Sequence, residues 1–214
     1  ALRFRMPIVL FGEGGGGRPG DDSTGPAVAF DTHTFTQFSK LSGAVPMIGV
    51  NHGRCFAGNT ALLACCDVII ATQDSTIAMG GPAMIEGGGL GIYTPEEVGP
   101  MSFQVPNGVV DILVEDEAEA VQVAKQYLSY FQGSVDSWEA PDQRRLRHIV
   151  PENRLRLYDM REVIATIADE DSVLEIREGF GVGVITCFIR VEGRPMGVIA
   201  NNPHHLAGAI DSDG

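Results

Sequence analysis

Residues 46–67 read PMIGVNHGRCFAGNTALLACCD, and this stretch decides the fold. Its apolar residues 47–50 predict a buried strand, residues 51–57 predict a loop, and the small and apolar residues 60–66 predict a helix after Gly58 and Asn59. A strand, a glycine-containing turn and a helix in this order direct backbone N–H groups toward one point. Such a point can stabilise the negative charge of an enolate or a tetrahedral oxyanion.

The same pattern is also typical of a packing unit in which Ala and Gly only permit close contact, and spacing alone favours this second interpretation. Two neighbouring stretches shift the balance. Residues 7–22 read PIVLFGEGGGGRPGDD, an apolar strand followed by a glycine loop, and Gly80 and Gly81 follow the strand-like residues 75–79. Three such junctions predict loops that converge at one end of a sheet, where open α/β folds bind ligands.

Other periodic stretches predict the remaining elements. Strands are expected at residues 8–11, 68–71, 184–191 and 196–200, and helices at residues 27–41, 115–131 and 159–168. Residues 134–151 lack apolar periodicity and contain Pro141, so they predict a linker.

Composition excludes some classes of function. The chain has 214 residues and a net charge of −13, which argues against a nucleic-acid surface. No apolar run reaches the length of a membrane span. The four cysteines, Cys55, Cys65, Cys66 and Cys187, form no CxxC pair, and the adjacent Cys65 and Cys66 are expected to pack as small apolar side chains. His204 and His205 are adjacent but lack further ligands, so no metal site is predicted.

Six segments, in this order along the chain, carry a resemblance to a known family: GGGGRPGDD (14–22), GRCFAGNTALLACCD (53–67), STIAMGGPAMIE (75–86), TPEEVGP (94–100), YDMREVIATIAD (158–169) and GRPMGVIANNPHHLAGAID (193–211). With them, the chain resembles the carboxyltransferase (beta) subunit of biotin-dependent acyl-CoA carboxylases of the acetyl-/propionyl-CoA carboxylase type. The ordered set, rather than any single segment, carries the resemblance, and it covers nearly the whole chain.

The resemblance implies an α/β protein with a crotonase-like (ClpP/crotonase) ββα superhelix. It implies three parts: residues 1–133 as the N-terminal carboxyltransferase domain, incomplete at its start; residues 134–157 as a linker; and residues 158–214 as the beginning of the C-terminal carboxyltransferase domain. Most of that second domain is expected to follow this sequence. The chain in isolation is therefore expected to be inactive.

The resemblance also implies an activity, namely transfer of CO2 from N-carboxybiotin to the α-carbon of an acyl-CoA, with released biotin as the base. Gly58 and Asn59 match the family's first oxyanion hole and are the predicted catalytic residues. The family commonly has a second glycine where this chain has Asn59, whose side chain is expected to narrow the pocket. The predicted substrate-binding residues are Gly16, Gly17, Arg18, Ala57 and Gly81.

The cofactor and partners follow from the same resemblance. Biotin is expected to be carried on a partner domain or subunit, and the acyl-CoA is the substrate. The expected partners are a biotin carboxyl carrier or biotin carboxylase component and further copies of the chain, as a dimer or larger oligomer. No nucleic-acid or membrane partner is expected, and the expected location is the cytoplasm.

Two other functions remain open at this point. A crotonase-type hydratase, isomerase or decarboxylase would share the fold but needs a side-chain acid or base, for which Glu86 is the best candidate. The pair Glu96 and Glu97 instead follows Thr94-Pro95 and predicts the first turn of a helix. The second alternative is a module that kept the fold for interactions without catalysis.

Overall fold

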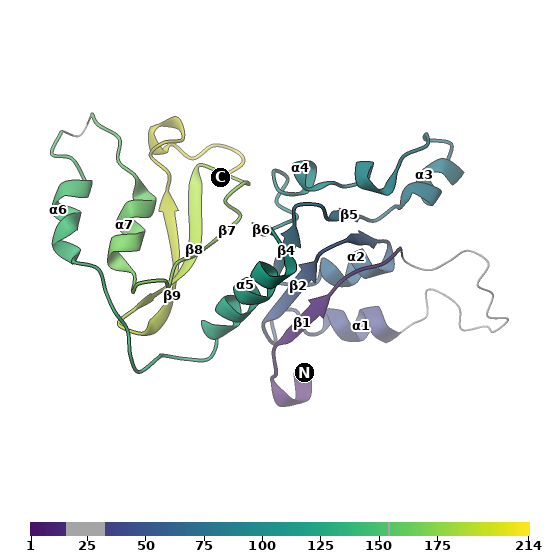
Figure 1. The fold of residues 1–214 in the computed structure, drawn as a ribbon, viewed down its shortest axis with the longest axis horizontal. Helices are drawn as coiled ribbons and strands as arrows, with labels where there is room; N and C mark the ends of the chain where they lie inside the picture. Colours follow the sequence, from purple (N-terminus) through teal and green to yellow (C-terminus); the bar gives the residue numbers. More distant parts are fainter. Residues whose placement is uncertain (16–32, 154) are drawn as a thin grey trace. The chain divides into compact units, whose positions relative to one another are not determined.

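The computed structural model describes residues 1–15, 33–153 and 155–214, and the chain forms two compact units, Ala1–Ala124 and Lys125–Gly214. The first unit contains two parallel sheets (Figure 1). The larger has the order β1 (Ile8–Phe11), β2 (Met47–Asn51), β4 (Val68–Thr72) and β6 (Ile112–Val114), and the smaller pairs β3 (Arg54–Phe56) with β5 (Thr76–Ala78). The predicted α/β class is confirmed.

The central strands β2 and β4 are buried at every residue. Their apolar runs lack the alternation of a half-exposed strand, as expected for parallel strands covered on both faces. An aspartate fixes the start of each strand. The Asp67 carboxylate accepts the N–H of Met47 at 2.8 Å, and the Asp111 carboxylate accepts the N–H of Ile69 at 2.7 Å. These side chains satisfy backbone donors where the ladders begin.

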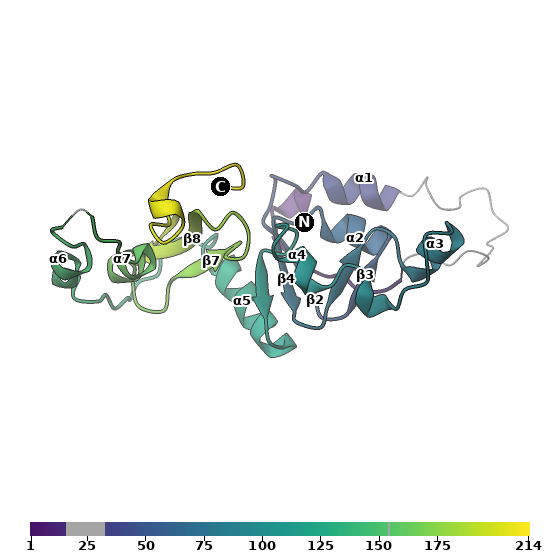
Figure 2. The same cartoon turned by 90° about the horizontal axis from the view of Figure 1, so that it is seen from above.

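The first unit also contains short helices, and α1 lies beside α2 (Figure 2). The elements are η1 (Leu2–Phe4), α1 (His33–Ser39), α2 (Gly58–Leu63), α3 (Pro82–Gly87), η2 (Pro95–Glu97), α4 (Met101–Gln104) and the first part of α5 (Glu117–Ser129). Leu63 of α2 is fully buried in the core with Cys55, Ile69 and Ile77. Among the described residues, no helix is long and apolar enough to cross a membrane.

Two predictions for the central stretch were inaccurate. Residues 51–57 were predicted as a loop, but Arg54–Phe56 form β3. Three residues are too few to show a period of two, and β3 exists because β5 and Gly14 pair with it. The helix predicted at 60–66 is Gly58–Leu63, because glycine and asparagine are tolerated in the first turn, where N–H groups need no intrahelical partner.

Close packing of α2 on β2 requires Gly49, because a Cβ at this position would overlap the buried Leu63 side chain. We predict that Gly49→Ala lowers the free energy of unfolding by about 1–3 kcal/mol, the usual cost of overpacking a core. Gly87→Ala is the matched control, since a Cβ there has no atom within 4 Å. Urea unfolding of the full-length protein measures both, and equal stability of the two variants would contradict this account.

The second unit is built on an antiparallel sheet of β7 (Leu174–Ile176), β8 (Val184–Val191) and β9 (Arg194–Asn201). Ile164 of α7 (Met160–Ile167) packs in one core cluster with Ile185 and Ile189 of β8. Figure 2 shows α6 (Leu146–Ile149) beside α7; η3 (Gln143–Arg145) and η4 (Leu206–Gly208) are the remaining helical turns. The predicted α7, β8 and β9 are confirmed, while the proposed domain limits at residues 133 and 158 remain predictions.

Buried polar groups hold the β8–β9 turn. The Asp169 carboxylate accepts the N–H groups of Glu192 at 2.9 Å and Gly193 at 2.7 Å. The Arg190 guanidinium, in a residue only 8% exposed, donates to the carbonyl oxygens of Ser129 at 2.6 Å, Gly133 at 3.0 Å and Gly193 at 2.8 Å. Arg190 thus satisfies carbonyls at and just beyond the carboxyl end of α5, where the helix dipole favours a cation.

Removal of this guanidinium should destabilise the second unit. We predict that Arg190→Met, which keeps the length of the side chain, costs about 1.5–3 kcal/mol, the range for hydrogen bonds to a charged group. Arg194→Met is the control, because the Arg194 side chain is exposed and has no hydrogen bond or ion pair among the described residues. Thermal unfolding of the full-length protein measures the two changes, and a shift no larger for Arg190→Met than for Arg194→Met would count against the role.

Candidate active site

Three strand ends in the first unit are joined by buried hydrogen bonds. The Asn51 amide at the end of β2 donates to the carbonyl of Gly12, just after β1, at 2.9 Å. The Ser75 hydroxyl, which follows β4, donates to the Asn51 carbonyl at 3.0 Å. The ends of β1, β2 and β4 therefore converge at one edge of the larger sheet. Of the three predicted glycine junctions, those after β1 and β2 lie at this edge, and the one at Gly80 and Gly81 follows β5 of the smaller sheet.

The predicted catalytic residues begin α2 at this edge. Ala57 precedes the helix with φ 55° and ψ −123°, and Gly58 and Asn59 are its first two residues. Among the residues that the structure describes, neither the Gly58 nor the Asn59 backbone N–H has an acceptor. A Cβ on Gly58 would lie 3.1 Å from the Phe35 ring, so a larger residue would crowd α1. Two N–H groups remain available to an anionic ligand atom.

The Asn59 side chain is turned toward the end of β1. Its amide donates to the carbonyl of Glu13 at 2.8 Å. Gly14, at φ +113°, packs against the same amide, because a Cβ there would lie 2.8 Å from Asn59 Nδ2. Gly14 is also held by β3, donating to the Arg54 carbonyl at 2.7 Å and accepting from the Phe56 N–H at 2.9 Å. Gly14, the first of the four consecutive glycines after β1, is thus fixed beside α2.

Two predicted substrate-binding residues lie near this helix start. The Ala57 N–H points at the carbonyls of Ala78 and Met79, at 3.2 and 3.1 Å. Gly81, which precedes α3, lies against the Phe56 ring, where a Cβ would be 3.5 Å from the ring. The β3–β5 pairing brings Ala57 and Gly81 to the same side of the site. Gly16, Gly17 and Arg18 lie outside the described residues.

Comparison with protein families identifies the chain. A model described as the carboxyl transferase domain matches residues 1–214. The chain belongs to the carboxyl transferase domain family. A solved structure of a single-chain, multi-domain long-chain acyl-CoA carboxylase is 60% identical, with a TM-score of 0.94, over 99% of this chain and 21% of that one. Transcarboxylase 12S, solved as a hexamer with methylmalonyl-CoA and methylmalonic acid bound, is 29% identical, with a TM-score of 0.82, over 99% of this chain and 43% of its own.

A curated relative is the biotin-dependent long chain acyl-coenzyme A carboxylase beta4 subunit of Mycobacterium tuberculosis, which is 31% identical over 97% of this chain and 42% of its own length. The chain spans less than half the length of the first curated relatives it matches. These likenesses confirm the suspected family and the α/β crotonase-like fold class.

Within this carboxyl transferase domain, sequence reasoning missed contacts between distant residues. The Glu13 carboxylate accepts the His52 N–H at 3.3 Å and lies 2.9 Å from His52 Nδ1. Arg54 pairs with Glu96, whose pKa lies below its usual value because its own N–H and the Arg54 guanidinium both stabilise the carboxylate. Glu13 and His52 meet because they follow neighbouring parallel strands, which only the pairing of β1 with β2 reveals.

Two other carboxylates of the first unit, those of Glu97 and Glu86, differ in their contacts. Glu97 accepts the N–H of Thr94 at 2.7 Å, which confirms the predicted capping of a helical turn. Glu86 is exposed on α3, and its side chain has no partner in the part of the chain that the structure describes. In the same described residues, no group of three His, Cys, Asp or Glu side chains could hold a metal ion.

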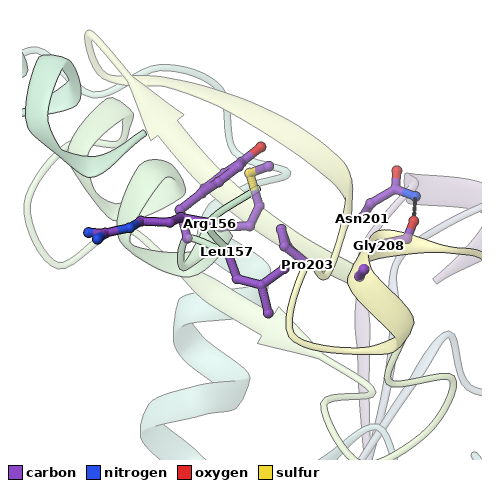
Figure 3. Close-up of a pocket in the computed structure, with 8 residues that line it drawn as sticks. Arg156, Leu157, Asn201, Pro203 and Gly208 are labelled. Atoms are coloured by element: carbon purple, nitrogen blue, oxygen red, sulfur yellow. Dashed lines mark hydrogen bonds between the residues drawn. The ribbon is translucent and has the colours of Figure 1, made fainter. Parts of the chain in front are cut away.

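The second unit contains a cavity of about 300 Å³ beside the end of β9. Figure 3 shows Asn201 donating to the Gly208 carbonyl, at 2.8 Å, on one side of it, while the Arg156 side chain extends away from this pair. Leu157 and Pro203 supply apolar lining. The cavity contains none of the predicted site residues, so the candidate active site is the start of α2.

Cys55 and Cys187 are buried and Cys66 is partly buried, and their surroundings do not activate these three thiols. Burial raises the pKa of Cys66 to about 12 and that of Cys187 to about 11. It also raises the pKa of Cys55, which lies under α2 in the core. Since the thiolate is the nucleophile, these side chains are poor nucleophiles at neutral pH. Cys65 and Cys66 pack against a buried cluster of Leu41, Val45 and Met47, as predicted for these two residues.

We predict that iodoacetamide at pH 8 leaves Cys66 and Cys187 unmodified in the folded protein, because a pKa raised to about 12 or 11 leaves almost no thiolate. The fraction of thiolate should increase only as the pH approaches those values. Peptide mass spectrometry after timed alkylation measures the modification. The same protein unfolded in urea is the control, and comparable rates in both states would refute the prediction.

Proposed function

We propose that the protein is the carboxyltransferase component of a biotin-dependent acyl-CoA carboxylase. The observation that carries the proposal is the match of the carboxyl transferase domain to residues 1–214. The N–H groups of Gly58 and Asn59 support it, because they match the family's oxyanion hole in sequence and have no acceptor among the described residues. Biotin on a partner component, an acyl-CoA substrate, a homo-oligomer and a cytoplasmic location belong to the same proposal.

The residues of this chain would act mainly through backbone donors. When an acyl-CoA loses its α-proton, negative charge moves onto the thioester oxygen. The N–H groups of Gly58 and Asn59 would donate to that oxygen and stabilise the enolate. Ala57 and Gly81 would line the space around it, where small residues permit close approach. Because backbone amides do not titrate, these donors hold the charge without a proton transfer of their own.

The donor set fits a bound cofactor that brings its own reactive groups. When bound, N-carboxybiotin supplies the CO2 that forms the new bond to the α-carbon, and the biotin released by cleavage of its N–C bond accepts the α-proton. The chain then needs to orient the thioester and stabilise its oxygen. The exposed position of Glu86 on α3 agrees with a reaction in which the cofactor, and not a side chain of this protein, supplies the base.

The competing enzyme function is a crotonase-type hydratase, isomerase or decarboxylase with Glu86 as its acid or base. A module without catalysis is the second competitor. Glu86 is exposed and its side chain has no partner among the described residues, so its surroundings do not favour the hydratase-type function. Membership of the carboxyl transferase family disfavours a module without catalysis. So do the N–H groups of Gly58 and Asn59, which have no acceptor among the described residues.

We predict that the full-length protein decarboxylates malonyl-CoA or methylmalonyl-CoA only when free biotin is present, because biotin must accept the carboxyl group. Release of the decarboxylated acyl-CoA, measured by liquid chromatography, reports the reaction. In the same assay Glu86→Gln should change the rate by less than about two-fold, whereas loss of a general acid or base costs roughly 10²–10⁴-fold. Turnover without biotin, or inactivation by Glu86→Gln, would favour the hydratase-type alternative. Failure to bind any CoA thioester would favour a non-catalytic module.

A further inference from the structure

The start of α2 lacks the usual means of fixing a helix terminus. Its N-cap is Ala57, which has no side chain that can accept a hydrogen bond from the first turn. Ala57 also adopts a positive φ of 55°, a conformation that L-residues rarely maintain unless the surroundings impose it. Some other interaction must therefore determine where the Gly58 and Asn59 N–H groups point.

The Thr60 side chain supplies one such interaction. Thr60 is buried, and its hydroxyl lies 2.7 Å from the Cys55 carbonyl of β3 and 3.0 Å from the Ala78 carbonyl of β5. The Ala78 carbonyl also lies 3.2 Å from the Ala57 N–H. One hydroxyl thus links the third residue of α2 to both strands of the small sheet, across the strained turn.

The Asn59 side chain supplies a second interaction on another strand. Its amide donates to the carbonyl of Glu13 at 2.8 Å, immediately after β1. Glu13 is itself held by His52, whose Nδ1 lies 2.9 Å from the carboxylate. The first turn of α2 is therefore attached through consecutive side chains to the small sheet and to the end of β1.

We infer that the side chains of Thr60 and Asn59 are positioning residues that aim the Gly58 and Asn59 N–H groups. The inference rests on the proposed function, since it assigns these N–H groups to the enolate oxygen. Neither side chain needs to touch the substrate. Their hydrogen bonds take the place of an N-cap and fix the donors before the charge develops, when preorganised donors are most effective.

The test is a comparison of kcat and KM for biotin-dependent decarboxylation of malonyl-CoA by the full-length protein. Thr60→Val keeps the shape of the side chain and removes the hydroxyl; Asn59→Ala keeps the backbone N–H and removes the amide. Each should lower kcat roughly ten- to hundred-fold and change KM by less than about two-fold, because the direction of the Gly58 and Asn59 N–H groups matters mainly in the transition state. A raised KM with unchanged kcat would overturn the inference.

Two control variants separate positioning from packing. Thr60→Ser retains the hydroxyl and should keep kcat within about two-fold of the unaltered protein. Thr72→Val removes a hydroxyl that is equally buried but bonds to Asp74 and Ser75 beyond β4, so it should affect stability and not kcat. Equal loss of kcat in Thr60→Ser and Thr60→Val would show that packing, and not the hydroxyl, is responsible. If Thr60→Val does not fold, Asn59→Ala carries the test, because Asn59 is partly exposed.

A second measurement does not depend on turnover. Hydrogen–deuterium exchange of the peptide that covers residues 57–63 should be faster in Thr60→Val and Asn59→Ala, and unchanged in Thr60→Ser. Unaltered exchange in the first two variants would overturn the positioning role, whatever the activity. If the unaltered protein shows no biotin-dependent turnover while exchange responds as expected, the proposed function fails and the attachment of α2 stands.

Discussion

The architecture of the first unit depends on how one carbonyl group, that of Ala78, connects β5 to the turn before α2. It receives the N–H of Ala57 and lies within hydrogen-bonding distance of the Thr60 hydroxyl. A non-glycine residue at positive φ costs on the order of 1–3 kcal/mol, so Ala57 keeps this conformation only because its neighbours impose it. The result is a helix that begins just after β3, with only Ala57 between them.

The second unit fixes a turn by the same kind of interaction. Asp169 holds the β8–β9 turn through backbone N–H groups, and Arg190 holds the neighbouring carbonyls. In both units apolar burial stabilises the sheets, while a few buried polar side chains decide the geometry where elements meet. Because the Asp169 and Arg190 side chains have hydrogen-bonding partners, their burial carries little of the penalty of an unpaired polar group.

Sequence patterns predicted the elements whose signal is long or continuous. The apolar runs of β2 and β4 and the periodic helices α5 and α7 are examples, because burial on one or both faces leaves a regular pattern. The three-residue strand β3 had no such signal, since its existence depends on β5, some twenty residues away along the chain.

The candidate site divides in the same way. Gly58 and Asn59 could be predicted from a motif, because the role proposed for them depends on local backbone geometry. The contacts of Thr60 with Ala78 and of Asn59 with Glu13 could not, since they require the strand order of both sheets. No rule of spacing relates residue 13 to residue 59, and only the pairing of β1 with β2 and the bridge from Gly14 to β3 bring them together.

A site made of backbone donors places different demands on a protein from a site made of titratable side chains. A carboxylate base is tuned through its pKa, so its surroundings must supply charge and desolvation. A backbone N–H needs only direction, and direction is set by hydrogen bonds that the substrate never touches. In this chain, Asn51, Thr60 and Ser75 are buried polar residues whose side chains donate to main-chain carbonyls near the strand ends. Their arrangement suits a reaction in which the cofactor brings the reactive groups, because the protein's own contribution is then the fixed position of two amide protons.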